Sequence, residues 1–131
     1  MVAASGPKAR ALAAAKADIV TLASGPLSSR DDMAQLTADL RTLAKDRAEK
    51  LELAMNIFVI GDQVPPWMQQ FLGVDAATLI AHDSLTMLRG NTRRMADELL
   101  RRRDAFGVSY VSVNAAFLQE MAPVVELLAG R

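Results

Sequence analysis

The sequence contains no cysteine, only one histidine and one tryptophan, and no net charge. Without cysteine there is no disulfide, no thiol nucleophile and no zinc-thiolate site, which fits a reducing compartment. A single histidine excludes histidine-cluster metal sites, and no Cys-His pair can be formed for nucleophilic catalysis. We therefore expect no metal site and no thiol chemistry in this chain.

The balance of charge and the lack of long apolar runs limit the partners. Fifteen basic residues match fifteen acidic ones, so no overall field attracts nucleic acid or an anionic membrane. No apolar run approaches the roughly 18–20 residues of a bilayer-spanning helix, and the N-terminus lacks the pattern of a signal peptide. We expect a cytoplasmic protein with no nucleic-acid and no membrane partner.

What is present is a core of ordinary size for one domain, since 51% of the 131 residues are apolar and 23% are charged. Strand-like and helical segments alternate along the chain, and this alternation predicts an α/β fold with a parallel sheet and flanking helices. The predicted strands are residues 1–4, 17–22, 51–60 and 108–113. The nearly continuous apolar run 51–60 is typical of a central strand covered on both faces.

Local signals mark where the helices begin and end. Ser29 and Asp32 have the spacing of a capping box, Asn91 is a helix-capping residue, and Gly107 ends the helix that Asn91 begins. Between residues 61 and 90 we expect two short helices and a brief extended segment, and we interpret this region as an insertion after the third strand.

Several side chains have both a structural and a functional interpretation. Trp67, Met68 and Phe71 could line a pocket, but such residues at helical spacing more often belong to the core.

His82 is expected to be a solvent-facing loop residue. The last helix, opened by Asn114, should bury the apolar residues Phe117, Leu118, Met121, Val124, Val125 and Leu128.

An arginine-rich helix is the strongest charged feature. The pairs Arg93–Asp97, Arg94–Glu98, Asp97–Arg101 and Glu98–Arg102 all have i,i+4 spacing, which is worth about 0.2–0.5 kcal/mol per pair on an exposed helix. We therefore predict a solvated face here, with no nucleic-acid patch.

The best site candidate is the turn Ala4-Ser5-Gly6-Pro7, between the first strand and the first helix. A glycine at such a turn lets backbone N–H groups approach an anion at the positive end of the helix. Many strand-to-helix turns with one glycine bind nothing, and neither of the common glycine-rich nucleotide motifs is present. From the residues alone, both interpretations of the turn stay open.

Five segments carry a family resemblance: residues 3–7 (AASGP), 17–20 (ADIV), 91–99 (NTRRMADEL), 102–111 (RRDAFGVSYV) and 121–128 (MAPVVELL). Together they resemble the C-terminal half of luciferase-like flavin- or deazaflavin-dependent oxidoreductases. The resemblance implies half of a (β/α)8 TIM barrel, with residues 1–4, 18–22, 51–60 and 108–113 as its fifth to eighth strands. Residues 1–131 then form one partial barrel domain with the insertion at about 61–90.

The same resemblance implies a cofactor and a site. In this family the turn after the fifth strand lies against coenzyme F420 or FMN near the ribityl phosphate, which assigns that role to Ala4, Ser5 and Gly6, with Pro7 adjacent. The chain has Ser5-Gly6 where the family often has two or more glycines. The cofactor carries out hydride transfer or oxygenation of a small organic substrate.

The first four strands of the family's barrel have no counterpart here, and they usually supply the acid or base, so no catalytic residue is assigned. The chain is expected to be completed by a separate N-terminal half or by a longer form of the protein. The alternative is a non-catalytic half-barrel that pairs with itself or with a partner through its edge strands.

Overall fold

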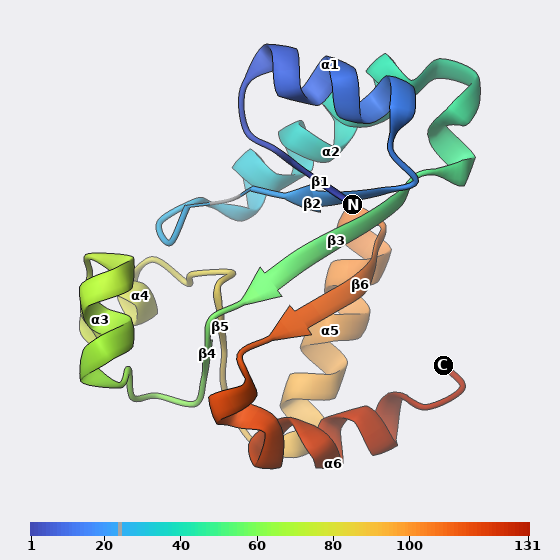
Figure 1. Cartoon of the computed structure of the whole chain (residues 1–131). Coiled ribbons are helices and arrows are strands. Elements are labelled where there is room, and N and C mark those ends of the chain that lie inside the picture. The colour runs from blue at the N-terminus through green and yellow to red at the C-terminus, as the bar shows by residue number, and fades with distance from the viewer. Residues whose placement is uncertain (24) are drawn as a thin grey trace.

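Four parallel strands form the main sheet of the protein, in the spatial order β1-β2-β3-β6 (Figure 1). The computed structural model describes residues 1–23 and 25–131, with Ala4 described by its backbone. The strands span Val2–Ala4 (β1), Ile19–Leu22 (β2), Glu52–Ile57 (β3) and Val108–Val113 (β6). β3 lies between β2 and β6, which confirms that the most apolar segment of the chain is a central strand.

Helices connect these strands and follow the last one. The longer ones are α1 (Pro7–Lys16), α2 (Arg30–Ala44), α5 (Thr92–Phe106) and α6 (Leu118–Leu128). Short 3-10 helices, η1 (Lys45–Lys50) and η2 (Ala115–Phe117), precede β3 and α6. The alternation of strand and helix confirms the α/β class predicted from the sequence. None of the helices in the two described stretches is long and apolar enough to cross a membrane.

The segment between β3 and α5 has its own small elements. It contains β4 (Val59–Ile60), α3 (Pro66–Leu72), α4 (Ala76–Ala81) and β5 (Met87–Leu88), and β4 pairs with β5 in a separate two-stranded parallel sheet. Figure 1 shows α3 and α4 projecting to one side of the main sheet. The interpretation of residues 61–90 as an insertion stays a prediction.

The predicted helix ends are confirmed by their hydrogen bonds. The Ser29 side chain accepts from the Asp32 N–H, and the Asp32 side chain accepts from the Ser29 N–H, which completes the capping box at α2. Asn91 caps α5 by accepting from the Arg94 N–H, and Gly107 ends α5 with a φ of 74°. That left-handed conformation favours glycine, which explains why the helix stops there.

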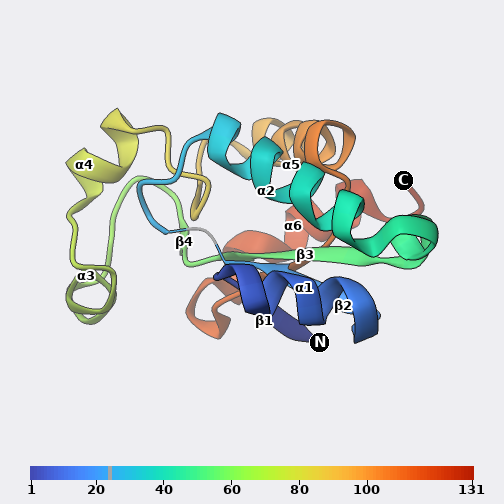
Figure 2. The same cartoon turned by 90° about the horizontal axis from the view of Figure 1, so that it is seen from above.

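One face of the sheet carries the core and the other is open. α2 and α5 lie side by side over the covered face (Figure 2). Leu53, Met55 and Ile57 of β3 are buried on this side. The alternate side chain Asn56 is exposed, and so are Tyr110 and Ser112 on the neighbouring strand. This second face is polar and exposed at Asn56 and Ser112, whereas Ala54 on the same face is buried.

The single strand predicted over residues 51–60 is wrong in one respect, because the chain leaves the main sheet at Phe58. Ile57 is the last residue paired with β6, opposite Val113. Beyond it, the N–H groups of Phe58 and Val59 both donate to the Thr86 carbonyl, at 2.8 and 3.2 Å. The run is divided because β6 ends there and a different neighbour supplies the next hydrogen bonds.

The buried side of the last helix is narrower than predicted. Phe117, Met121 and Val124 are buried, whereas Leu118 and Val125 are 66% and 55% exposed. Burial at positions i, i+4 and i+7 describes a single stripe, and the helix chiefly packs against α5. Leu118 and Val125 each lie one position beyond the stripe, so no element covers them in the described structure.

Candidate cofactor site at the carboxyl ends of the strands

The carboxyl ends of β1, β2, β3 and β6 meet at one edge of the sheet because the strands are parallel. In parallel α/β folds, ligands bind at this edge, where the loops that follow the strands converge. The predicted site lies here: β1 ends at Ala4, and its backbone pairs with Leu22 at the end of β2. The structure thus places the predicted turn next to the loop after β2.

The turn itself leads directly into α1. Ser5 is exposed, Gly6 occupies the N-cap position of α1, and Pro7 begins the helix. The Gly6 carbonyl accepts the Arg10 N–H at 2.9 Å. No side chain caps this helix, and its first turn contains no acidic residue. Within the described residues, the first N–H groups of α1 therefore have no side-chain cap, and its first turn places no negative charge at the positive end of the helix dipole.

Gly6 leaves space at this helix end. Its φ and ψ of −94° and 169° suit any residue, and a Cβ placed on it would have no heavy atom within 4 Å. The fold itself does not require glycine here, so the empty volume is available to a ligand. Lys8, exposed in the first turn of α1, adds a positive charge that we did not single out from the sequence. The position of Lys8 directly after the glycine turn is the sequence feature that could have identified it.

A hollow of about 340 Å³ lies at the carboxyl ends of β2 and β3, and its lining includes Leu22, which pairs with Ala4. Its lining residues come from the ends of β2 and β3 and the loop after β2: Leu22, Ala23, Gly25, Asn56 and Phe58. Its size falls in the range of small-molecule pockets, about 300–1,000 Å³. Asn56 was not predicted as a site residue, although a polar residue within an apolar strand was a usable signal.

One aromatic side chain of α3, that of Phe71, contacts Phe58 in the lining of this hollow. The Phe58 and Phe71 rings contact one another with centroids 5.7 Å apart. Phe71 and Trp67 are 71% and 52% exposed, whereas Met68 is buried. The core interpretation is therefore right for Met68 and wrong for the two aromatic residues, because α3 is a short helix that buries only its Met68 side.

Polar side chains on the open face of the sheet are linked across β3 and β6. The Ser112 hydroxyl donates to the Asn56 side-chain carbonyl, and the Ser109 hydroxyl donates to the Glu52 carboxylate at 3.0 Å. Hydroxyl, amide and carboxylate groups thus line the uncovered face and reach the hollow at Asn56. This arrangement can supply hydrogen bonds to a polar ring system above the sheet.

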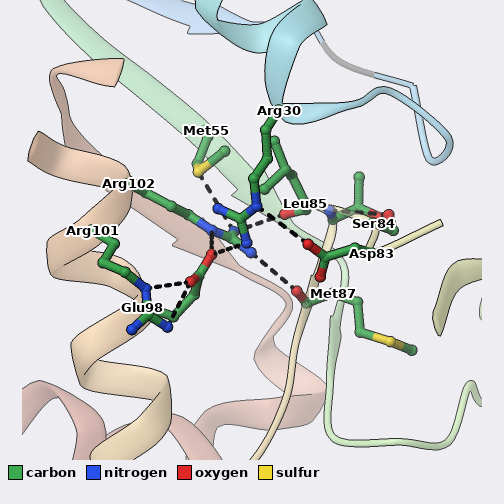
Figure 3. Close-up of polar contacts among 10 residues, drawn as sticks. Arg30, Met55, Asp83, Ser84, Leu85, Met87, Glu98, Arg101 and Arg102 are labelled. Carbon is green, nitrogen blue, oxygen red and sulfur yellow. Dashed lines mark hydrogen bonds and ion pairs between the residues drawn. The ribbon is translucent and has the colours of Figure 1, made fainter. Parts of the chain in front are cut away.

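The arginine-rich helix differs from its predicted solvated form. The i,i+4 pairs Arg93–Asp97 and Glu98–Arg102 are present, at 3.5 and 2.9 Å. Arg102, however, is only 3% exposed, because it points inward from α5 (Figure 3). The solvated-face prediction is wrong at Arg102, which sequence spacing could not distinguish from its exposed neighbours.

Arg102 holds α5 against the segment that contains β5. Its guanidinium donates to the carbonyl oxygens of Leu85 and Met87, at 2.8 and 3.3 Å, and lies 3.7 Å from the Met55 sulfur (Figure 3). Burial lowers the pKa of Arg102, although hydrogen bonding to Glu98 opposes this. Burial alone would raise the pKa of the Glu98 carboxyl, but hydrogen bonds from Arg102 and Arg30 hold that pKa below its ordinary value.

The single histidine does not line the hollow, and it is adjacent in sequence to Asp83, which pairs with Arg30. His82 is exposed, as predicted, and its Nδ1 lies 3.0 Å from the Thr78 carbonyl oxygen. Within the described part of the chain, no three His, Cys, Asp or Glu side chains are grouped so that they could hold a metal ion.

Comparisons with known proteins identify the fold. No protein-family model and no curated protein matches the sequence. Among solved structures, long-chain alkane monooxygenase (LadA) matches 97% of this chain and 40% of its own, with a TM-score of 0.64 and 13% identity. The chain has the fold of part of a TIM barrel.

Two further structures agree over 97% of this chain. DmoA from Hyphomicrobium sulfonivorans matches over 41% of its length, with a TM-score of 0.63 and 15% identity. Riboflavin lyase (RcaE), solved with modified FMN and the substrate riboflavin, matches over 42%, with a TM-score of 0.62 and 10% identity. The chain thus spans about two fifths of the length of these proteins.

Proposed function

We propose that this chain is part of a luciferase-like oxidoreductase that binds FMN or coenzyme F420 and acts on a small organic substrate by hydride transfer or monooxygenation. The observation that carries the proposal is the uncapped N-terminus of α1, which follows β1 at the same edge of the sheet as a hollow at the ends of β2 and β3. The fold shared with LadA and with RcaE, whose structure contains modified FMN, supports a flavin-type cofactor.

The turn Ala4-Ser5-Gly6-Pro7 would hold the phosphate of the cofactor. An anion fits there, because the space at Gly6 is open and the first turn of α1 has no acidic side chain. Lys8 would add one charge-assisted hydrogen bond to the same group. The bound cofactor would supply the hydride or oxygen chemistry, while this chain would orient it.

The hollow and its aromatic edge would receive the substrate or one end of the ring system. Phe58 and Phe71 present apolar faces, and Asn56 places an amide at the same end of β3. Such a site favours an organic molecule with an apolar body and few polar groups. None of the described residues that line this hollow is an acid or a base, so we assign no catalytic residue.

Completion of the barrel is part of the proposal. The main sheet has four strands, and a TIM barrel has eight. A longer form of the protein, a separate N-terminal half or a second copy would supply the remaining strands. β1 and β6 are edge strands of the described sheet, and this observation also favours the second candidate function, a non-catalytic module that pairs through these edges.

The first test is the size of the protein in its source cells, followed by titration of that form with FMN and with F420. Lys8→Gln should weaken binding of either cofactor roughly tenfold, which corresponds to about 1.4 kcal/mol. Lys16→Gln is the matched control, because Lys16 is an exposed lysine in the last turn of α1, far from the proposed phosphate. It should leave binding unchanged.

Gly6→Ala separates a ligand role from a structural one. The added methyl group occupies the open space at the turn, so cofactor binding should weaken while the free energy of unfolding changes by less than about 1 kcal/mol. Wild-type affinity for both cofactors in Gly6→Ala and Lys8→Gln would show that the turn is not their site. A native form that binds neither cofactor would favour the pairing module.

A further inference from the structure

A second, strongly polar hollow lies away from the proposed cofactor turn. It measures about 340 Å³ and is lined by residues at the start of α2, by Asp62, by residues within 79–90 and by one side of α5. Five arginines and three carboxylates line it, so its lining carries two more positive than negative charges, in a chain whose net charge is zero. This excess of positive charge is confined to the lining of the hollow.

The three carboxylates do not provide acceptors for all the N–H donors of these arginines. Glu98 alone accepts hydrogen bonds from Arg30 at 2.7 Å, from Arg102 at 2.9 Å and from Arg101 at 3.0 Å (Figure 3). Arg30 has a second partner, Asp83, at 3.2 Å. Each guanidinium has five N–H donors in a planar fork. Arg102 also donates to the carbonyl oxygens of Leu85 and Met87, so the donors left for another acceptor in this group are on Arg30 and Arg101.

Arg94 is a further source of free N–H donors, because it forms no ion pair within residues 1–23 and 25–131. Its side chain lies across Gly90: a Cβ placed on Gly90 would be 3.0 Å from the Arg94 Cβ and 3.3 Å from its Cδ. Both residues line the hollow. The absence of a side chain at Gly90 therefore lets an arginine with no carboxylate partner lie at the edge of a cationic hollow.

The helix beneath this arginine adds to the positive potential. Arg94 is in the first turn of α5, which contains no acidic residue, so the positive end of the helix dipole is not neutralised locally. The neighbouring Arg89 is already paired with Asp62 at 2.6 Å. Arg101 lies on the same side of the same helix and donates to Glu98 through Nε and Nη2, so among the described residues the donors without an acceptor include those of the Arg94 guanidinium and the Nη1 of Arg101.

We propose that this hollow binds a small oxyanion, the phosphate group of a small molecule, through Arg94 and Arg101. A planar guanidinium donates two parallel hydrogen bonds to a phosphate, and a hollow of this size can contain the group with part of the molecule that carries it. Arg30 and Arg102 hold the walls in place through Glu98. The site is separate from the α1 turn and does not depend on flavin binding.

The test uses inorganic phosphate as the probe, with potassium chloride at equal ionic strength as the reference. Phosphate should bind the wild-type chain more tightly than chloride does. Arg94→Gln should weaken phosphate binding at least fivefold, and Arg94→Lys should recover part of the loss because the charge is kept. Arg93→Gln is the matched control: Arg93 is the adjacent exposed arginine, paired with Asp97, and it does not line the hollow.

Backbone chemical shifts locate the phosphate in the wild-type protein without relying on any variant. Shifts centred on residues 89–94 and 98–102 would support the proposal, and Gly6→Ala should leave them unchanged. Shifts centred on residues 5–9 would overturn it and would favour the α1 turn as the anion site. Equal weakening by Arg93→Gln and Arg94→Gln, or no preference for phosphate over chloride, would also overturn it.

Discussion

Replacing the buried Arg102 with methionine tests how α5 is held against the segment that contains β5. Arg102 joins α5 to the carbonyl groups of Leu85 and Met87, at 2.8 and 3.3 Å, and is 3% exposed. Methionine keeps most of the aliphatic stem, so the variant removes the guanidinium with little loss of packing. Glu98 keeps Arg30 and Arg101 as partners, at 2.7 and 3.0 Å.

The expected loss of stability comes mainly from the two carbonyl groups. A buried polar group that loses its hydrogen-bond partner costs about 1–3 kcal/mol, so two of them cost about 2–6 kcal/mol. Breaking a buried ion pair from one side costs about 3–5 kcal/mol, which lies in the same range. For a chain of this length the loss corresponds to a decrease in Tm of roughly 10–20 °C.

Urea denaturation followed by circular dichroism measures this loss, with Arg103→Met as the control. Arg103 is the next residue on α5, but its side chain is 45% exposed and forms an ion pair with Asp104, its neighbour in the sequence, at 3.3 Å. Its replacement should change the free energy of unfolding by less than about 0.5 kcal/mol. If Arg102→Met and Arg103→Met differ by less than about 1 kcal/mol, the hydrogen bonds of Arg102 do not stabilise the fold as argued.

Two smaller effects follow from the same structure. Ser29→Ala removes the capping box of α2 and should lower the free energy of unfolding, measured by urea denaturation, by about 1 kcal/mol. Thr42→Ala, at an exposed position of the same helix, should leave the free energy of unfolding unchanged. Equal losses of stability in the two variants would contradict the capping argument. The pKa of Glu98 is lowered in the folded state, so its contribution to stability is present above about pH 4.5 and decreases as the pH falls through that lowered pKa. Stability of the wild type should therefore fall more steeply than that of Glu98→Gln between pH 5 and pH 3, and parallel profiles would contradict the ion-pair assignment.

The turn at residues 4–7 could be predicted from the sequence, whereas the hollow at the ends of β2 and β3 could not. The turn at residues 4–7 was recognisable because strand, glycine and helix follow one another within a few residues. The hollow formed by Asn56 and Phe58 was not, because it depends on where β3 leaves the main sheet. That departure requires the Thr86 carbonyl, which is contributed by a segment almost thirty residues away.

The arginine cluster was also predictable in part from the sequence and in part not. Spacing along α5 predicted the Glu98–Arg102 pair, because residues four apart on a helix are neighbours. Spacing could not predict that Arg30 would reach the same carboxylate from α2, or that Arg102 would be buried. Both facts depend on how two helices and the segment before α5 pack together.

The sequence by itself determined the order of strands and helices, the helix ends at Ser29, Asn91 and Gly107, and the parallel α/β class. These features rest on hydrogen bonds and apolar spacing within a few residues of the chain. Only the tertiary structure decided which of the arginines is buried and which aromatic side chains are exposed. Those outcomes depend on groups that distant segments bring together, because burial is set by what packs against a side chain and local spacing leaves that partner unspecified.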